Sequence, residues 1–251
     1  MTDRYFVESP IQGESARLVA GEAHHLLHVM RATPGDLLTL FDDSGAEFTA
    51  RVERVGRADV ELAVISRLVV DRELKFALTL GVALPKGDRQ RYLVEKATEL
   101  GVARLVPLES EHAIDRATPS TLEKLRRAVI EASKQCGRNR LMEISAPQSL
   151  DEFLAAATTG GVRLIAHPGG RGCADALAAL LPPESAPPVA LAIGPEGGFT
   201  QAEVALAESC GWQTVDLGPR VLRVETAAVA LVSVLVQRLG GTDDECATGG
   251  E

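Results

Sequence analysis

Two unusual turns lie within the stretch LAIGPEGGFTQAEVALAESCGWQTVDLGPRVLRVE, which runs from Leu191 to Glu225. The first turn, Gly194 to Gly198, follows the continuously apolar run Val189 to Ile193, which is typical of a strand buried on both faces of a sheet. The second turn, Gly218 to Arg223, follows Val215-Asp216-Leu217, which also reads as a strand. A helical pattern comes after each turn. The stretch therefore predicts two consecutive strand–turn–helix units.

The helices of both units have recognisable boundaries. Thr200 opens the first helix, Glu203 completes a capping box three residues later, and Gly211 is a typical stop. The second helix, Thr226 to Leu239, is strongly apolar. Glycines in the two turns permit positive φ and allow a ligand to approach the backbone closely.

The two turns have two interpretations. They are either ordinary connections of an α/β domain, with glycines that serve geometry alone, or parts of a ligand site. Glu196 and Arg223 favour a ligand site, because a tight turn does not need them and charged residues at strand ends tend to face a ligand. Neither the GKS/GKT ending of a P-loop nor the GxGxxG dinucleotide spacing is present.

Strands and helices alternate through the rest of the chain from Leu74 onward. This alternation predicts an α/β domain whose parallel sheet has helices on both faces. The predicted strands are Phe76–Leu84, Leu105–Leu108 and Arg163–His167, and the predicted helices are Arg89–Leu100 and Thr121–Cys136.

Residues 1–72 are predicted to be mainly β. The runs Asp36–Phe41 and Glu47–Val55 flank a hairpin-type turn, and Val60–Val70 is a further strand. With one short helix at Gly21–Arg31, these strands suggest a small barrel. We therefore expect one domain at 1–72, a second at 73–240, and a disordered tail at 241–251.

Composition favours a cytoplasmic protein without a metal site. The chain is 45% hydrophobic, and its four cysteines are scattered without a CxxC pair, which argues against structural zinc and disulfides. His24 and His28 stand four apart on a predicted helix, but no HExxH glutamate accompanies them, so we prefer a polar helix face to a metal site. The N-terminus lacks a signal peptide's apolar core, and the longest apolar run, Ala227–Val236, is too short to span a bilayer.

Several motifs, in one order along the chain, resemble the RsmE family of RNA methyltransferases. The resemblance rests on IGPEGGFT-x-x-E followed by LG-x-R-x-LR-x-ETA, and on Arg4–Val7, Lys96–Gly101 and Lys134–Arg138. Met30 and Val221 are mild departures, since leucine and isoleucine are commoner there. The resemblance implies the SPOUT class, with a PUA-like RNA-binding domain at 1–72 and a C-terminal trefoil knot within 73–240. It also implies a homodimer that uses S-adenosylmethionine to methylate N3 of a uridine in 16S ribosomal RNA.

Three predicted loops, at 167–170, 194–198 and 218–223, follow strands and are expected to meet at the carboxyl edge of the sheet. In similar proteins such loops bind the methyl donor through backbone groups and apolar walls. His167 has an alternative role as a core histidine. The residues that the resemblance assigns to donor binding are His167, Gly169, Leu191, Gly194, Pro195, Gly198, Leu217, Gly218, Val221 and Leu222.

Methyl transfer to a uridine nitrogen needs alignment of the reactants and loss of the N3 proton, but no metal. Arg223 is the candidate to stabilise negative charge on the uracil oxygens, and a phosphate clamp is its alternative role. Glu196 or Glu225 is the candidate to accept the proton or to hold Arg223. For Glu225, helix-dipole stabilisation is the alternative.

Basic residues are concentrated in the middle of an acidic chain of net charge −9. Residues 73–140 carry 13 Lys and Arg against 9 Asp and Glu, whereas acidic residues are in excess on both sides. Surface salt bridges and a solvated helix face are the alternatives to RNA contacts. The target base is expected to be turned out of folded RNA. The candidate RNA contacts are Arg4, Arg31, Lys86, Arg89, Arg91, Lys134 and Arg138.

Two rival functions stay open. The first is a ribose 2′-O-methyltransferase of the same knotted class, against which the PUA-like N-terminus and the LR-x-ETA turn argue. The second is a non-catalytic RNA-binding protein that keeps the fold, and the intact glycine turns and Arg223 argue against it.

Overall fold

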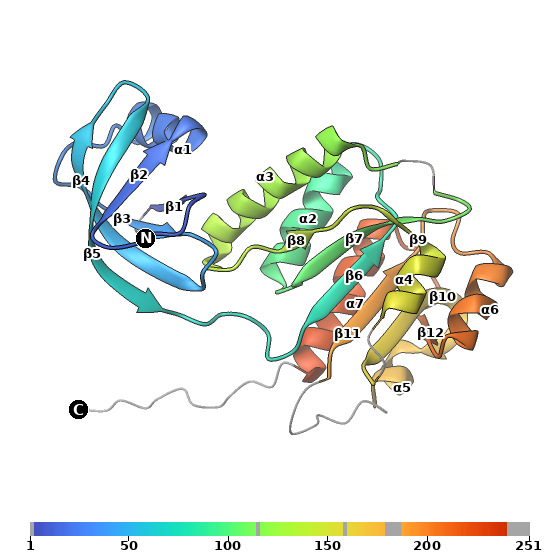
Figure 1. The fold of residues 1–251 in the computed structure, drawn as a ribbon. Coiled ribbons are helices and arrows are strands. Elements are labelled where there is room, and N and C mark those ends of the chain that lie inside the picture. The colour runs from blue at the N-terminus through green and yellow to red at the C-terminus, as the bar shows by residue number, and fades with distance from the viewer. Residues whose placement is uncertain (1–2, 114–115, 158–159, 179–186, 240–251) are drawn as a thin grey trace, which may run out of the picture. The chain divides into compact units, whose positions relative to one another are not determined.

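The computed structural model describes residues 3–113, 116–157, 160–178 and 187–239 (Figure 1). The chain divides into two compact units, of which the first comprises Met1–Glu73 with Val129–Leu141, and the second comprises Leu74–Ala128 with Met142–Glu251. The sequence analysis assigns Val129–Leu141 to the second domain, whereas the structure groups it with the first unit. The expected tail at 241–251 lies outside the described residues.

The first unit is built on a five-stranded sheet. Its strands run in the order β1-β3-β4-β5-β2, with β1 parallel to β3 and the other pairs antiparallel. The predicted strands are confirmed to within one residue at each end. The buried face carries Tyr5, Leu18, Leu40, Phe48 and Leu62. The strands are β1 Arg4–Phe6, β2 Ser15–Val19, β3 Leu37–Phe41, β4 Ala46–Val55 and β5 Asp59–Val69.

The short helix of this unit differs from the prediction. Instead of one helix over Gly21–Arg31, an α-helical turn, α1 (Ala20–His24), continues into a π-helical turn, η1 (His25–Val29). Arg31, just after it, has φ +56°, in the left-handed region that non-glycine residues rarely adopt. Such an extra residue in a helical turn is not visible in a hydrophobic pattern.

The second unit contains a seven-stranded sheet with parallel pairs throughout. The strand order is β12-β10-β11-β6-β7-β8, and β9 pairs with β7. The prediction of a parallel α/β sheet is therefore confirmed. The strands are β6 Leu78–Val82, β7 Arg104–Glu109, β8 Glu143–Ile144, β9 Gln148–Ser149, β10 Val162–Gly172, β11 Val189–Ile193 and β12 Gln213–Asp216.

Helices cover both faces of this sheet (Figure 1). On one face, α7 packs against α2, β6 and β11; on the other, α4 and α6 pack together over β7 and β10. Phe153 of α4, Val204 of α6 and Trp212 belong to the core beneath this second pair. The helices are α2 Arg89–Glu99, α4 Leu150–Ala156, α5 Cys173–Ala178, α6 Gln201–Ser209 and α7 Val224–Leu239. A further helix, α3 (Pro119–Cys136), begins in this unit, and its residues from Val129 onward belong to the first unit.

The chain crosses the sheet at its C-terminal end. Strand β12 lies at the edge of the sheet, next to β10, but the helix that follows it, α7, packs against β11 and β6 further in. The segment between them, residues 217–223, therefore passes the carboxyl ends of the intervening strands. This path brings the second glycine turn beside the first.

Candidate functional site

A pocket of about 280 Å³ opens at the carboxyl ends of β10, β11 and β12. Three segments, 166–168, 193–198 and 215–222, line it together with Val224 and Ala227 of α7. These segments overlap the three loops that the sequence analysis expected to meet at one edge of the sheet, although Gly169, Gly170 and Arg223 do not line the pocket. They come together because parallel strands end at the same edge.

Most residues predicted to bind the donor lie in the wall of this pocket. Two of them do not. Leu191 is fully buried within β11, and Gly169 acts through its backbone by donating a hydrogen bond to Asp216. Those that line the pocket are His167, Gly194, Pro195, Gly198, Leu217, Gly218, Val221 and Leu222.

Asp216 is a pocket residue that the sequence analysis missed. Its Oδ2 accepts a hydrogen bond from Gly169 N–H (3.0 Å), and its Oδ1 accepts one from Gly218 N–H (2.8 Å). The hydrogen bonds from Gly169 and then from Gly218 lower the pKa of the Asp216 carboxyl below its usual value. An aspartate two residues before a glycine often bonds to that backbone N–H, so the sequence Asp216-Leu217-Gly218 carried a local signal.

The loop after β10 is not a plain strand end. The prediction placed a strand at Arg163–His167 with a loop behind it, whereas β10 extends to Gly172. The pairing with β12 slips between Ala166 and Arg171, so the residues between them bulge out of the ladder. This bulge carries His167 into the pocket wall and places Gly169 beside Asp216.

The first glycine turn is stabilised by the N-terminal cap of α6 and by residues 111–112. The predicted capping box is confirmed, since Thr200 and Glu203 exchange side-chain and backbone hydrogen bonds at the start of α6. Glu203 also accepts a hydrogen bond from Glu111 N–H (3.0 Å), and Nδ1 of His112 lies 3.2 Å from the carbonyl oxygen of Gly198. The segment around residues 111–112 therefore supports the turn, which the sequence pattern did not indicate.

The close neighbour of Gly194 is a side chain of the protein itself. A Cβ atom at this position would lie 3.1 Å from the ring of Phe199, which is buried in the core beneath α4 and α6. A larger residue here would therefore need the Phe199 ring to shift by a few tenths of an ångström.

The three predicted catalytic residues have different surroundings. Glu196 lines the pocket, and Glu225 is buried at the first turn of α7. Both carboxylates lie within 4.0 Å of Arg89, and not of Arg223. Arg223 is exposed, and it forms no ion pair with any residue that the structure describes. The predicted possibility that a glutamate holds Arg223 is therefore wrong for this structure, and the guanidinium is accessible to a substrate.

Several predicted RNA contacts bind other residues of the first unit. Arg4 pairs with Glu47 (3.0 Å), donates to Asn139 Oδ1 (2.6 Å) and lies over the Phe41 ring. Lys134 pairs with Glu22 (3.1 Å), and its ammonium lies 5.5 Å from the centroid of the Tyr5 ring. These contacts attach Val129–Leu141 to the β-sheet.

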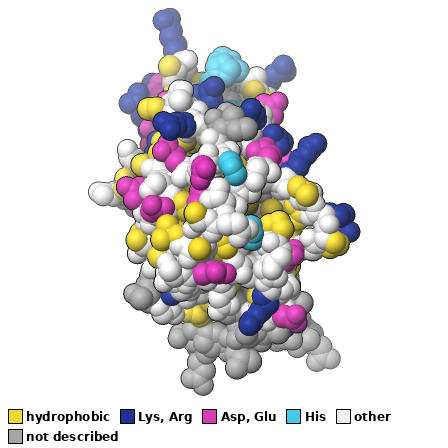
Figure 2. All heavy atoms as spheres, turned by 90° about the vertical axis from the view of Figure 1, so that its right-hand side faces the viewer, with side chains coloured by type: hydrophobic (Ala, Val, Ile, Leu, Met, Phe, Trp, Pro, Cys, Tyr) yellow, Lys and Arg dark blue, Asp and Glu magenta, His cyan; other side chains and the backbone are white. Residues whose placement is uncertain are grey.

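Arg138 is the clearest departure from an RNA contact, because it is only 4% exposed and pairs with Glu73. By contrast, Arg31, Lys86 and Arg91 are exposed, and Arg91 pairs with Glu95 one turn along α2. Asp and Glu side chains are interspersed among Lys and Arg on the face seen in Figure 2. Much of the basic excess in 73–140 is thus balanced by carboxylates.

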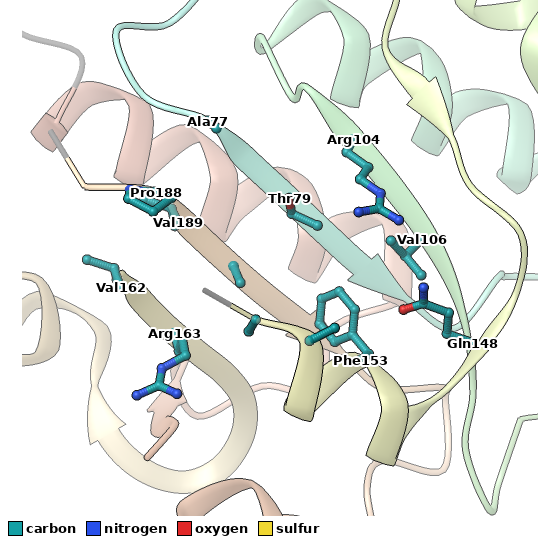
Figure 3. A pocket seen from close by; sticks show the side chains of 13 residues that line it. Ala77, Thr79, Arg104, Val106, Gln148, Phe153, Val162, Arg163, Pro188 and Val189 are labelled. Atoms are coloured by element: carbon teal, nitrogen blue, oxygen red, sulfur yellow. The ribbon is translucent and has the colours of Figure 1, made fainter. Parts of the chain in front are cut away.

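A second cavity, of about 210 Å³, lies toward the amino ends of the strands (Figure 3). Its floor includes a row in register across four strands, Arg163, Ala190, Thr79 and Arg104. Arg104 donates to Ser145 Oγ (2.7 Å), and Arg163 donates to the Cys210 carbonyl (2.8 Å). Ligands of such sheets bind at the carboxyl ends of the strands, so the first pocket is the candidate site.

Two further features bear on the classes of site considered above. Among the described residues, no group of three or more His, Cys, Asp or Glu side chains is arranged to hold a metal ion, and His24 and His28 contact each other with ring centroids 4.5 Å apart. None of the helices in the described ranges is long and apolar enough to cross a membrane.

Comparison with known proteins matches both parts of the chain. Residues 72–236 match an RNA methyltransferase domain, and residues 20–65 match an RNA methyltransferase PUA domain. Ribosomal RNA small subunit methyltransferase E of Synechocystis sp. is 31% identical over 224 residues, which are 88% of this chain and 73% of that protein. The protein of the same name from Bacillus subtilis is 28% identical, covering 92% of this chain and 95% of its own.

Two solved structures are similar over nearly the whole chain. A methyltransferase from Legionella pneumophila in complex with S-adenosylmethionine has a TM-score of 0.87 and 35% identity, with 96% of this chain and 99% of that chain covered. Ribosomal RNA small subunit methyltransferase E of Neisseria gonorrhoeae, bound to S-adenosylmethionine, has a TM-score of 0.86 and 28% identity, with the same coverage.

These similarities confirm the predicted fold class, a SPOUT-type knotted parallel sheet with helices on both faces and a small PUA-like β-domain before it. The domain match covers more than half of the chain, and the Synechocystis relative covers most of it. The chain therefore belongs to the RsmE family, the ribosomal RNA small subunit methyltransferases E.

Proposed function

We propose that this protein transfers a methyl group from S-adenosylmethionine to N3 of a uridine in 16S ribosomal RNA. The observation that carries this proposal is the pocket formed by both glycine turns at the carboxyl ends of β10, β11 and β12. It lies in a chain whose fold closely matches two methyltransferases with S-adenosylmethionine bound. We assign the reaction to the cytoplasm because the proposed substrate is ribosomal RNA.

The residues of the pocket fit the methyl donor. Leu217, Val221 and Leu222 offer apolar walls for an adenine ring, and the backbone around Gly194 and Gly218 offers hydrogen-bonding groups. Glu196 adds a negative charge to a wall that would meet a sulfonium cation. When bound, the donor supplies an electrophilic methyl group on sulfur.

Residues around the pocket can accept the N3 proton and stabilise the charge that develops on the uracil. Uridine N3 carries a proton that must leave, and the charge that develops spreads onto the uracil oxygens. Exposed and without an ion pair among the described residues, Arg223 is available to stabilise that charge. Glu196 lines the pocket and is 41% exposed, whereas the Glu225 side chain is 8% exposed. Of the two, we assign the acceptance of the proton to Glu196.

We assign recognition of the RNA to exposed basic residues. Arg31 in the first unit and Lys86 and Arg91 in the second are exposed, and they keep the predicted role of phosphate contacts. The described structure engages Arg4, Lys134 and Arg138 within the first unit, so we assign them to its stability. We also propose a homodimer, because the resemblance implies one and Val221, at the pocket, is 95% exposed in the single chain.

The proposal is tested by the identity of the methylated nucleoside. The purified protein is incubated with isotopically labelled S-adenosylmethionine and small-subunit ribosomal RNA from a strain that lacks it, both free and within the subunit. After digestion, mass spectrometry distinguishes a methyl group on the base from one on the ribose. We expect 3-methyluridine. A 2′-O-methyl product would favour the ribose enzyme, and RNA binding without methyl transfer would favour the non-catalytic alternative.

Asp216→Asn should weaken donor binding about fivefold, because an amide makes weaker hydrogen bonds than a carboxylate to Gly169 and Gly218. Folding lowers the pKa of the Asp216 carboxyl. The contribution of Asp216 to the stability of the folded protein is therefore complete above the usual carboxyl pKa, and it is lost as the pH falls through the pKa of the folded state. Titration calorimetry at pH 7 measures the effect. Asp151→Asn, an exposed carboxylate in the first turn of α4, is the control. Equal affinities of the two variants would remove Asp216 from the site.

A further inference from the structure

Arg89, the first residue of α2, lies between two carboxylates that are far apart in the sequence. Its Nη2 lies 3.1 Å from Oε1 of Glu196, and its Nη1 lies 3.8 Å from Oε2 of Glu225. Glu196 belongs to the turn after β11, and Glu225 to the first turn of α7. One guanidinium therefore contacts both of the strand–turn–helix units that form the pocket.

Glu225 has the stronger need for this partner. Its side chain is only 8% exposed, and its Oε2 is buried without a hydrogen-bond partner among the described residues. A buried carboxylate that lacks compensation is costly. The N-terminal end of α7 supplies part of that compensation through the helix dipole. Within the described ranges, Arg89 is the cation that lies within 4.0 Å of it.

Glu196 is the more exposed partner. Its side chain is 41% exposed and lines the pocket, and the Arg89 side chain between the two carboxylates is 33% exposed. Val224 and Ala227, on either side of Glu225 along α7, line the same pocket. The two ion pairs of Arg89 thus connect Glu196, in an exposed turn of one pocket wall, to Glu225, a buried residue of the opposite wall.

We propose that Arg89 is a positioning residue for methyl transfer, an inference that rests on the proposed function. By binding Glu196 and Glu225 together, it holds the two walls of the donor pocket at one spacing. This role replaces the RNA contact predicted for Arg89. Arg89 and its two glutamate partners together carry a net negative charge. Such a cluster does not attract a phosphate of the RNA backbone.

The test measures donor affinity and reaction rate separately. Arg89→Ala should weaken S-adenosylmethionine binding about tenfold in calorimetry without RNA, a typical scale for residues in one ion-pair network. The single-turnover rate with saturating donor and RNA should also fall. Arg89→Lys should restore only part of both, because an ammonium does not span two carboxylates as a planar fork does. Arg127→Ala is the matched control, since Arg127 is an exposed helical arginine paired with Glu123.

A double-mutant cycle separates positioning from general stability. In a Glu196→Gln background, Arg89→Ala should cost less than about threefold in donor affinity, because the connection between the walls is already broken. An equal cost in both backgrounds would overturn the proposal, as would parent affinity and rate in Arg89→Ala. If Arg89→Ala does not fold, Arg89→Lys in the same two backgrounds completes the cycle.

Measurements of RNA affinity distinguish a positioning role of Arg89 from a phosphate contact. A phosphate contact at Arg89 would show a loss confined to RNA affinity, with a shallower salt dependence and unchanged donor binding, and would overturn the proposal. A parent protein that binds the donor but methylates no ribosomal RNA would contradict the proposed function instead. The coupling between Arg89 and Glu196 in donor affinity would then still decide whether Arg89 sets the spacing of the pocket walls.

Discussion

Arg223→Ala should slow methyl transfer about a hundredfold or more, the scale on which enzymes lose rate when one fixed stabiliser of developing charge is removed. The guanidinium is exposed in the turn that leads into α7, and no carboxylate among the described residues occupies it. Donor affinity should change little, because Arg223 does not line the pocket. A single-turnover assay with saturating RNA and donor isolates the chemical step from binding.

Two further variants give this experiment its controls. Arg223→Lys should recover only part of the rate, since an ammonium lacks the fixed, planar set of donors of a guanidinium. Arg238→Ala, at an exposed position near the other end of α7, should match the parent. If Arg223→Ala reaches the parent rate at saturation and differs only in RNA affinity, Arg223 is a phosphate clamp and the catalytic assignment is wrong.

Gly170→Ala should lower the free energy of unfolding by about 1–3 kcal/mol, the usual cost of forcing atoms into a packed site. A Cβ atom there would lie 2.9 Å from main-chain atoms of Thr214 and Val215 in β12. The backbone of β12, which is paired with β10, cannot turn aside as a flexible side chain does. Donor binding should fall by more than tenfold, because β12 carries Asp216 and leads into Leu217. Urea unfolding and calorimetry measure the two effects.

The matched control lies two residues further along the same strand. A Cβ atom at Gly172 would meet only Asp175 Oδ2, at 3.6 Å, which is an ordinary contact. Gly172→Ala should therefore change the free energy of unfolding by less than about 0.5 kcal/mol. A loss in Gly170→Ala as small as the one expected for Gly172→Ala would mean that the bulge of β10 tolerates displacement and that its approach to β12 is not required.

Local signals account for the parts of the fold that were predicted correctly. The apolar run before Gly194, the capping box of Thr200 and Glu203, and the hairpin turn before β4 each depend on residues close in sequence. The same holds for the convergence of the glycine turns, since strands that are parallel must end at one edge. The path of the chain from β12 to α7 follows from no local pattern and was implied by the family motifs alone.

Contacts between distant residues account for what was not predicted. The basic residues of 129–141 suggest an RNA surface in the sequence, but Lys134 pairs with Glu22 and Arg138 with Glu73, 112 and 65 residues away. Arg89 similarly forms ion pairs with Glu196, in the turn after β11, and with Glu225, in the first turn of α7. A charge count records how many groups of each sign are present and does not record which of them are already neutralised.

The helix cap behind the first glycine turn has a consequence for the entropy of binding. Thr200 and Glu203 bond to each other's backbone, and Glu203 also fixes the segment at Glu111. The turn Gly194–Gly198 is therefore connected directly to a helix end that is already ordered in the free protein. A ligand that meets such a turn loses its own freedom but does not have to order the protein's loop as well. Much of the affinity is then determined when the chain folds, before any ligand arrives.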